Sequence, residues 1–212
     1  MTWDDHEFTN DGWGDHPSGT ADPPADPERR SAANRAWAEF LPTACHLTSG
    51  TAPDASVRYD PDLPAAEQVR LWREVRFGTL AHLFFTDERL HRDGHACGER
   101  TREKYLVPPC ADVGTADRTM QGAEQREWFT DHVSGSTSTW KVWANEPMLL
   151  QLKLRSGHLA ELLDALPDAV TDRLPAAVHG VHVSLDQWDG YQAERTAIAR
   201  RLLAAGVTDL VT

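Results

Sequence analysis

Short apolar runs alternate with amphipathic stretches along this chain, and the alternation predicts strands and helices in turn. Residues 75–85 are mostly apolar and predict a buried strand, with Leu80, Leu83, Phe84 and Phe85 in the core. Residues 140–144 follow the two-residue period of a strand. Residues 207–212 are rich in β-branched side chains and predict another buried strand.

Between these strands, apolar residues recur at the spacing of an amphipathic helix. The expected helices span residues 31–41, 123–133, 158–166 and 191–205. Ser31 is suited to cap the first of them, which has Trp37 and Phe40 on its apolar side, and Gly206 fits the end of the last. Loops rich in Gly, Pro and Asp are expected at residues 14–30 and 45–64. Strands interleaved with helices predict the α/β class.

Length and charge narrow the range of functions. The 212 residues suffice for one large domain, or for a piece of one. A formal net charge of -12 argues against a general nucleic-acid-binding surface. A metal site could still neutralise the phosphate of a small phosphoester locally. No apolar run approaches the roughly 18 residues of a membrane span, and the residues after Met1 lack the basic and apolar regions of a signal peptide.

The chemistry of the chain is concentrated in its first dozen residues. Three carboxylates and an imidazole occupy residues 4–7, with aromatic side chains on both sides and Asn10-Asp11-Gly12 after them. Such a density of negative charge is costly to fold unless a cation lies among the carboxylates. Carboxylate, imidazole and amide groups are also the ligands that metals select. The alternative is a solvated acidic loop against which Trp3 and Phe8 pack.

Five blocks resemble, in order, the sequence signature of the alkaline phosphatase D family, within the calcineurin-like metallophosphoesterases. They are Trp3-Asp4-Asp5-His6-Glu7 followed by Asn10; Thr86-Asp87-Glu88-Arg89-Leu90-His91-Arg92-Asp93, after Phe77-Gly78-Thr79-Leu80; Met120-Gln121-Gly122 through Trp128-Phe129; Trp140-Lys141-Val142; and Trp188-Asp189-Gly190-Tyr191. The first block is the most specific, and together the blocks cover nearly the whole chain.

The resemblance implies an architecture as well as a family. It implies part of a four-layer αββα fold, in which two mixed sheets lie between helices. Residues 1–212 would form part of a single metallophosphatase catalytic domain. The family's N-terminal and C-terminal metal-binding segments have no counterpart here, so an internal fragment of that domain is expected. A fragment would leave strand edges and apolar faces uncovered.

The resemblance also implies metal-dependent hydrolysis of a phosphate monoester or diester by the parent domain, with iron together with calcium. Asp5 matches a bridging metal ligand, and Asp4 is either a second ligand or an acid that orients one. His6 would be the catalytic residue, contacting a phosphoryl oxygen or assisting the leaving group. Asn145, at a strand end, is a candidate ligand through its oxygen, or an ordinary turn residue. Asn34 could face the same pocket or serve as a packing amide.

A zinc site is one interpretation of the segment that contains His91, Asp93, His95, Cys97 and Cys110. The spacing of these residues fits none of the usual structural zinc patterns. Related secreted members of the family carry a Cys-bounded loop at this place. The resemblance therefore favours a Cys97–Cys110 disulfide over free thiols and over zinc. Such a disulfide implies an oxidising compartment, so the parent protein is expected to be secreted or held at the cell surface.

Two other functions stay open. The chain could be a catalytically inactive fragment, because two of the three segments that supply metal ligands in the family have no counterpart in it. It could instead be a secreted calcium-binding or interaction module that uses the acidic clusters and the Cys-bounded loop. Neither alternative explains the ordered set of five blocks.

Overall fold

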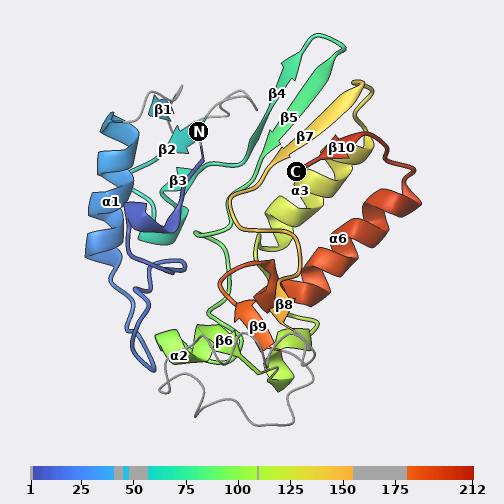
Figure 1. Ribbon diagram of the computed structural model, residues 1–212. Coiled ribbons are helices and arrows are strands. Elements are labelled where there is room, and N and C mark those ends of the chain that lie inside the picture. Colours follow the sequence, from blue (N-terminus) through green and yellow to red (C-terminus); the bar gives the residue numbers. More distant parts are fainter. Residues whose placement is uncertain (1, 41–44, 48–56, 109, 155–180) are drawn as a thin grey trace.

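The computed structural model describes residues 2–40, 45–47, 57–108, 110–154 and 181–212. Within these ranges the chain forms three small sheets with helices packed beside them (Figure 1). The α/β class predicted from the pattern is confirmed, and the sheets are mixed. The helix expected at 158–166 lies outside the described residues. Across the described ranges, no helix has both the length and the apolar character that crossing a membrane requires.

A four-stranded sheet forms the centre of the structure. Its order is β10 (Leu210–Val211), β7 (Trp140–Ala144), β5 (Ala81–Phe85) and β4 (Arg73–Phe77). β10, β7 and β5 run parallel, whereas β5 and β4 form an antiparallel hairpin. The strand predicted at 140–144 is therefore present with the expected bounds.

Two of the predicted strands need correction. The run 75–85 is not one strand, because Gly78 takes a left-handed backbone conformation with φ +56° and turns the chain into a hairpin. Leu80 lies beside this turn and is 64% exposed, so it is not a core residue. At 207–212 only Leu210–Val211 form a strand, and it is an exposed edge rather than a buried strand.

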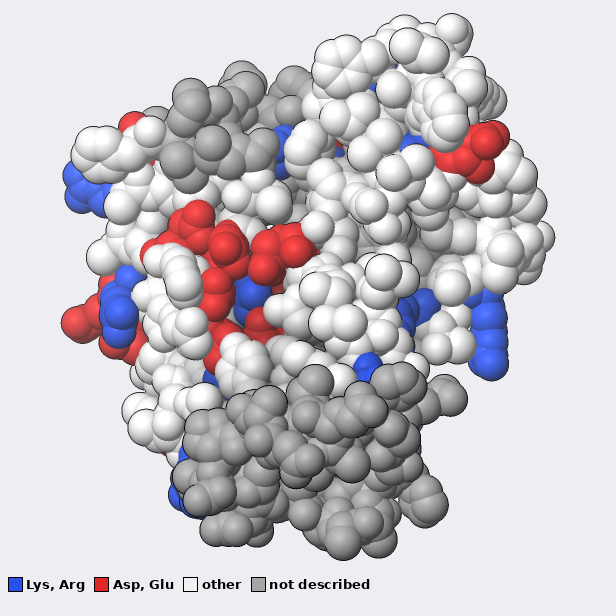
Figure 2. Space-filling model, in the orientation of Figure 1, with Lys and Arg blue, Asp and Glu red and all other residues white. Residues whose placement is uncertain are grey.

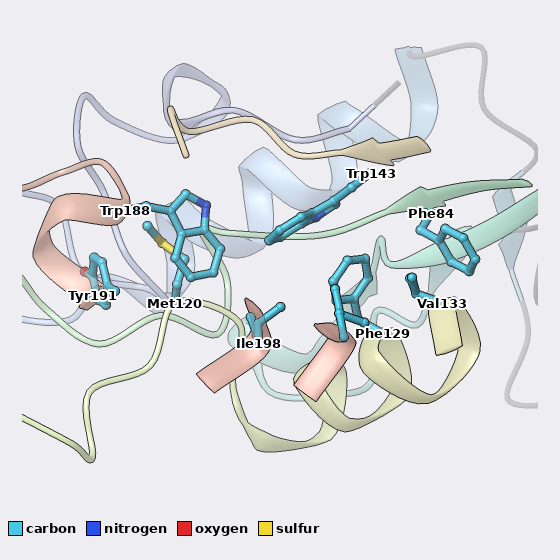
Figure 3. Packing of buried hydrophobic residues seen from close by; sticks show 9 residues of the cluster. Phe84, Met120, Phe129, Val133, Trp143, Trp188, Tyr191 and Ile198 are labelled. Carbon is cyan, nitrogen blue, oxygen red and sulfur yellow. The ribbon is translucent and has the colours of Figure 1, made fainter. Parts of the chain in front are cut away.

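Two helices cover one face of the central sheet. They are α3 (Ala123–Ser134) and α6 (Gln192–Ala204), and both begin and end within one residue of their predicted bounds. The buried side chains between helices and sheet include Phe84, Trp143, Phe129, Val133 and Ile198 (Figure 3). The rings of Phe129 and Trp143 lie 4.5 Å apart between centroids, which joins α3 to β7 directly.

Helix α1 spans Pro27–Phe40 and begins before the predicted cap at Ser31. Asp26 caps it instead, because its Oδ1 accepts the N–H of Arg29 at 3.1 Å. The proline at the start has no N–H to leave unpaired and has its φ already set for a helix, which favours the earlier beginning. At the other end, Phe40 is 82% exposed and does not lie on the buried side as predicted.

Two further sheets have three strands each. One contains β1 (Cys45–Leu47), β2 (Val57–Tyr59) and β3 (Val69–Arg70), so the loop predicted at 45–64 includes short strands. The other contains β6 (Tyr105–Val107), β9 (Val181–Ser184) and β8 (Lys153–Leu154), beside the short helix α2 (Thr101–Lys104). α1 packs on the first of these sheets through a buried cluster that includes Trp37, as the sequence predicted for that residue.

The face of the central sheet that points away from α3 and α6 is apolar. Its apolar side chains are Val75, Phe77, Ala81, Leu83, Phe85, Trp140, Val142, Ala144 and Val211, all half-buried or exposed. The face also carries one buried cation, Arg73, whose guanidinium lies over the ring of Phe85. Antiparallel sheets commonly leave one face to water, but that face is then polar. An apolar face of this extent instead marks a surface that packs against another element or another molecule.

We expect the chain to self-associate through this face of the sheet. Val142→Lys places a charge on the face and should shift the chain toward the monomer. Leu203→Lys is the matched control, because Leu203 is 75% exposed on α6 and lies away from that face. Sedimentation velocity over a range of protein concentrations measures both. A wild-type chain that stays monomeric throughout that range would contradict the prediction.

Candidate functional site

The acidic segment forms one turn of 3-10 helix, η1 (Asp5–Glu7). Asp4 caps this turn: its Oδ1 accepts the N–H of Asp5 at 2.7 Å, and its own N–H donates to Glu7 Oε2 at 2.9 Å. The reciprocal bonds use two of the carboxylates as acceptors and so offset part of their mutual repulsion. Trp3, directly before the turn, is buried against Trp37 of α1 at 5.5 Å between ring centroids, which anchors the segment.

Asp5 is buried whereas its neighbour His6 is exposed. Asp5 is 8% exposed and its Oδ2 accepts the N–H of Asp11 at 2.6 Å. Burial raises the pKa of the Asp5 carboxyl, although that hydrogen bond opposes the shift. His6 Nε2 lies 3.0 Å from Asn10 Oδ1. The hydrogen bond to Asn10, followed by the charge of Asp5, raises the pKa of His6, so its imidazole holds a proton more tightly than a free histidine does.

Two asparagines considered as ligands have different surroundings. Asn145 follows β7, where its Oδ1 accepts Trp188 Nε1–H at 2.7 Å and its Nδ2 donates to the carbonyl of Pro147. It therefore orders the turn after β7, and its oxygen keeps one further lone pair. Asn34 is buried on α1 and donates through Nδ2 to the carbonyl of Ala65 at 2.8 Å. Its Oδ1 is buried and has no hydrogen-bond partner among the described residues.

Arg89 is a buried cation held between two carboxylates. It is 2% exposed; Nε and Nη2 donate to the two oxygens of Glu146 at 2.9 Å each, and Nη1 donates to Asp186 Oδ1 at 2.9 Å. Asp4 Oδ1 lies 3.8 Å from Nη2. Burial opposes the charge on Arg89, but Asp186 and Glu146 outweigh burial and raise its pKa. Asp87, two residues before Arg89, contacts it through the backbone: its Oδ1 accepts the N–H of Arg89 at 2.9 Å.

Two more basic side chains, Arg92 and His95, contact Asp186 beside Arg89. Arg92 Nη1 lies 3.0 Å from Asp186 Oδ1, and His95 Nε2 lies 2.9 Å from the same oxygen. His95 Nδ1 lies 2.7 Å from Glu99 Oε2, so both of its ring nitrogens face carboxylates rather than a zinc ion. Burial alone would raise the pKa of Asp186, but Arg92, the hydrogen bond from His95 and Arg89 hold it well below its usual range. Asp186 was not predicted as a site residue, and its place just before the Trp188-Asp189 block is the one signal in the sequence that points to it.

Figure 2 shows acidic side chains gathered around a hollow on one face of the molecule, between the N-terminal segment and the central sheet. Glu146 and Asp4 approach each other through their shared contact with Arg89. Burial raises the pKa of Glu146 to about 7, although Arg89 opposes the shift. Burial also raises the pKa of Glu88 to about 8, and Glu88 Oε2 accepts the N–H of Glu146 at 3.5 Å. Burial is the main cause of both shifts and the charges of neighbouring carboxylates add to it, so a bound cation would offset part of the cost of ionising these groups.

The expected site residues are only partly brought together. Asp4 and Asp5 lie side by side at η1, and Arg89 links Asp4 to Glu146, the neighbour of Asn145. Over the part of the chain that the structure describes, no group of three or more His, Cys, Asp or Glu side chains is placed to hold a metal ion. These residues therefore form part of an acidic site and not a complete ligand shell.

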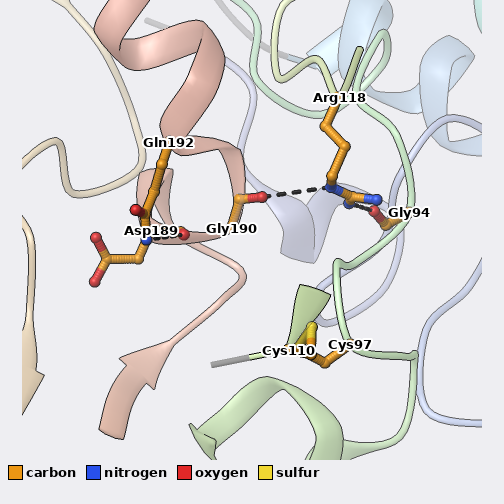
Figure 4. The surroundings of a disulfide bond; sticks show 7 residues. All are labelled: Gly94, Cys97, Cys110, Arg118, Asp189, Gly190 and Gln192. Atoms are coloured by element: carbon orange, nitrogen blue, oxygen red, sulfur yellow. Dashed lines mark hydrogen bonds between the residues drawn. A yellow bond between two sulfur atoms is a disulfide. The ribbon is translucent and has the colours of Figure 1, made fainter. Parts of the chain in front are cut away.

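Cys97 and Cys110 form a disulfide, with 5.9 Å between their Cα atoms (Figure 4). The segment that it closes carries α2 and β6, and two of its side chains bind the loop after η1. Lys104 Nζ lies 2.7 Å from Asp11 Oδ2, and the Tyr105 hydroxyl donates to Asp11 Oδ1 at 2.6 Å. The N–H of Asp11 in turn binds Asp5, so the disulfide-closed segment supports the position of that carboxylate.

Comparison with known proteins gives a consistent result. The model of the PhoD-like phosphatase family matches residues 1–212. Alkaline phosphatase D of Bacillus subtilis (strain 168) is 26% identical over 211 residues, which cover 100% of this chain and 29% of that protein. A solved structure of PhoD has a TM-score of 0.67 and 23% sequence identity, with 99% of this chain and 32% of that chain covered. The chain thus spans less than a third of the length of these relatives.

The family model matches the whole length of this mixed α/β chain, and the family is one of phosphoesterases. The chain belongs to the PhoD-like phosphatase family. The resemblance based on the five sequence blocks is thereby confirmed, and the fold of the described residues agrees with it.

Replacing Arg89 should be strongly destabilising, because Glu146 would be left buried without its cation and Asp186 would lose one of its three basic partners. We expect Arg89→Met to lower the free energy of unfolding by about 3–5 kcal/mol at neutral pH. Arg35→Met is the control: Arg35 contacts Glu39 at 2.7 Å on the exposed side of α1, and such a solvent-screened pair contributes little to stability. Urea unfolding compares the two variants, and equal losses would show that the buried contacts of Arg89 are not what stabilises the fold.

Glu88→Gln should flatten the dependence of stability on pH. The pKa of Glu88 is about 8 in the folded chain, against an ordinary value of 4.5, so the folded state binds this proton more tightly than the unfolded state. The contribution of Glu88 to stability is then fully present below pH 4.5 and is lost as the pH rises to about 8, by about 1.4 kcal/mol per unit of pKa difference. An amide does not ionise, so the variant should lose less stability over the same range.

Denaturant unfolding at a series of pH values, with EDTA present, measures this difference between Glu88→Gln and wild type. Other titrating groups are common to both chains and cancel in the comparison. Profiles that run parallel from acidic to alkaline pH would mean that Glu88 ionises in the folded chain as it does in the unfolded one.

Proposed function

We propose that this chain contributes part of the metal site of a phosphatase that hydrolyses phosphate monoesters or diesters. The observation that carries the proposal is the adjacent pair Asp4 and Asp5, placed beside Arg89 and Glu146 in an acidic region of the surface. Burial raises the pKa of Asp5, a cost that a bound cation would remove. The match of the first sequence block to the family supports the same residues.

Iron together with calcium is the proposed metal set. Carboxylate oxygens are suitable donors for both, so Asp5 would bind a metal and Asp4 would bind or orient the second ligand position. When bound, such ions polarise the phosphoryl group and lower the pKa of a water molecule. Calcium takes roughly 6–8 oxygen ligands, more than the described residues bring together here. The others would come from the larger part of the relatives' length that this chain does not span.

His6 is the proposed catalytic residue. Its Nε2–H donates to Asn10 Oδ1, which leaves Nδ1 as the ring atom able to meet the substrate. The raised pKa of His6 favours the imidazolium, so Nδ1 can donate to a phosphoryl oxygen or to the oxygen of the leaving group. Asn145 is proposed to add an oxygen ligand, because its Oδ1 has a lone pair beyond its bond to Trp188. Asn34 is proposed to face the same pocket with its buried Oδ1, which has no hydrogen-bond partner among the described residues.

The fold and the location of the parent domain are also part of this proposal. The parent domain is proposed to have the four-layer arrangement, with the apolar face of the central sheet packed against a second sheet. The Cys97–Cys110 disulfide supports a protein that folds in an oxidising compartment and acts outside the cytoplasm. A second candidate is a chain without catalysis of its own, or a calcium-binding or interaction module, and it is favoured by the incomplete ligand set among the described residues.

The test is Asp5→Asn in the protein produced from its complete reading frame. Removing the ligand charge while keeping the side-chain shape should release the bound metal and lower phosphatase activity by roughly 100-fold or more. Metal content is measured by elemental analysis, and activity with p-nitrophenyl phosphate and bis(p-nitrophenyl) phosphate. Asp62→Asn is the matched control, because Asp62 is an exposed aspartate outside the site.

Unchanged metal content and turnover in Asp5→Asn would remove Asp5 from the site. Calcium that raises the melting temperature of the wild type without any ester hydrolysis would favour the binding module. Loss of both metal and activity in Asp5→Asn alone supports the phosphatase.

A further inference from the structure

A cavity of about 130 Å³ lies beside the first turn of α3. Its wall includes His91, Gln121 and Glu124, with the indole of Trp72 on its apolar side. None of the residues that line it belongs to the Asp4–Glu7 segment or to the turn at Asn145. A space of this size has room for an ion with several water molecules.

Two buried oxygen atoms lack hydrogen-bond donors: one belongs to Gln121 in the wall of the cavity, and the other to Asp87, which lies behind the wall and contacts the wall residues His91 and Gln125. Asp87 is fully buried, and its Oδ1 accepts the N–H groups of Arg89 and Leu90 at 2.9 and 3.0 Å, but its Oδ2 has no partner among the described residues. Gln121 is also fully buried and lines the cavity, and its Oε1 has no partner either. A buried acceptor without a donor is costly to fold, so two of them together point to a bound species.

His91 supplies a nitrogen at the right separation to share an ion with Asp87. Its Nε2 lies 4.0 Å from Asp87 Oδ2, which is too long for a hydrogen bond. Ligand atoms bound to one tetrahedral Zn²⁺ at about 2.0–2.2 Å are roughly 3.3–3.6 Å apart, so the two atoms would have to approach each other by about 0.5 Å. An ion between the two atoms would therefore need little movement of either side chain.

The backbone around these side chains is held in place. Gln125 binds Asp87 twice, with its Oε1 accepting the N–H of Asp87 at 2.8 Å and its Nε2 donating to the carbonyl of Asp87 at 2.7 Å. Gly122 has φ +76°, and a Cβ atom there would lie 3.2 Å from the Cβ of His91. The close approach of His91 to the start of α3 thus depends on glycine, and it brings the imidazole to the wall of the cavity.

The chemistry of these groups selects the kind of ligand. The start of a helix ordinarily favours anions, but carboxylate, amide oxygen and imidazole nitrogen are acceptors, and Glu124 adds another negative charge. Arg30 is buried and its charge interacts with Asp87, which weakens a purely electrostatic cation site. An imidazole ligand beside oxygen ligands therefore favours a borderline ion such as Zn²⁺ over Ca²⁺.

We propose that Asp87, His91 and Gln121 bind a divalent transition-metal ion at this cavity, separately from the metals of the proposed catalytic site. Oδ2 of Asp87, Nε2 of His91 and Oε1 of Gln121 are the protein ligands, and water molecules in the cavity complete the shell. The site does not depend on the proposed catalytic function, because it shares no residue with Asp4, Asp5, His6, Asn34 or Asn145.

The test is calorimetric titration of Zn²⁺ into the Asp5→Asn protein with Cys45 alkylated, which removes the catalytic ligand and the remaining thiol as competing sites. We expect one Zn²⁺ per chain. His91→Gln and Asp87→Asn should each weaken binding by roughly tenfold or more, since even residues that only support a ligand change metal affinity by about 10–100-fold. Gln121→Glu should tighten binding, because it replaces an amide oxygen with a charged one.

His132→Gln is the matched control. His132 Nδ1 also faces a carboxylate, Glu74 Oε2 at 2.6 Å, but it is not on the wall of the cavity, so this variant should bind Zn²⁺ like its parent. Asp87→Asn keeps the acceptor at Oδ1, and circular dichroism checks that each variant is folded. If Asp87→Asn unfolds, the Zn²⁺ affinity of His91→Gln alone tests the proposed site. Absence of Zn²⁺ binding in the Asp5→Asn background, or binding that His91→Gln leaves unchanged, would overturn the proposal and mean that only water meets these atoms.

Discussion

Burying the guanidinium of Arg89 is the constraint on which the rest of the structure depends. A cation removed from water must be paired on nearly all its donor atoms, or its burial costs more than its contacts return. Glu146 and Asp186 meet this requirement, and they come from residues 57 and 97 positions further along the chain. The turn after β7 and the segment after β9 must therefore both reach the end of β5. One side chain thus fixes how three parts of the chain meet.

Asp186 extends this constraint to the Cys-bounded loop. Its contact with His95, and that of His95 with Glu99, carry the network from the central sheet into the segment closed by the disulfide. The same segment holds Asp11 through Lys104 and Tyr105, and Asp11 holds Asp5. The position of the acidic turn is accordingly set by buried polar pairs on both of its sides. Networks of this kind demand that every member is satisfied, which makes them specific as well as costly.

The sequence was informative wherever a structure depends on neighbours along the chain. α3, α6 and β7 were predicted with nearly the right bounds, because their apolar side chains recur every few residues on one face. It failed at Gly78, where one left-handed residue inside an apolar run makes a hairpin. The acidic turn at Asp5 could be found from its local composition. The partners of Arg89 could not, because no periodic signal connects residues that lie so far apart in sequence.

The same distinction explains why the candidate site is only half visible in the sequence. A motif such as Trp3-Asp4-Asp5-His6-Glu7 reveals a concentration of charge, but whether a carboxylate faces a metal or a protein cation depends on the fold. Glu146 and Asp186 neutralise Arg89, whereas Asp5 has only backbone and like-charged neighbours within hydrogen-bond reach. Repulsion and burial raise the pKa of such a group and make it a poor contributor to stability by itself. The surroundings of Asp5 therefore differ from those of Glu146 and Asp186, which are paired with a buried cation of the protein, and this difference is what the proposal of a metal at Asp5 rests on.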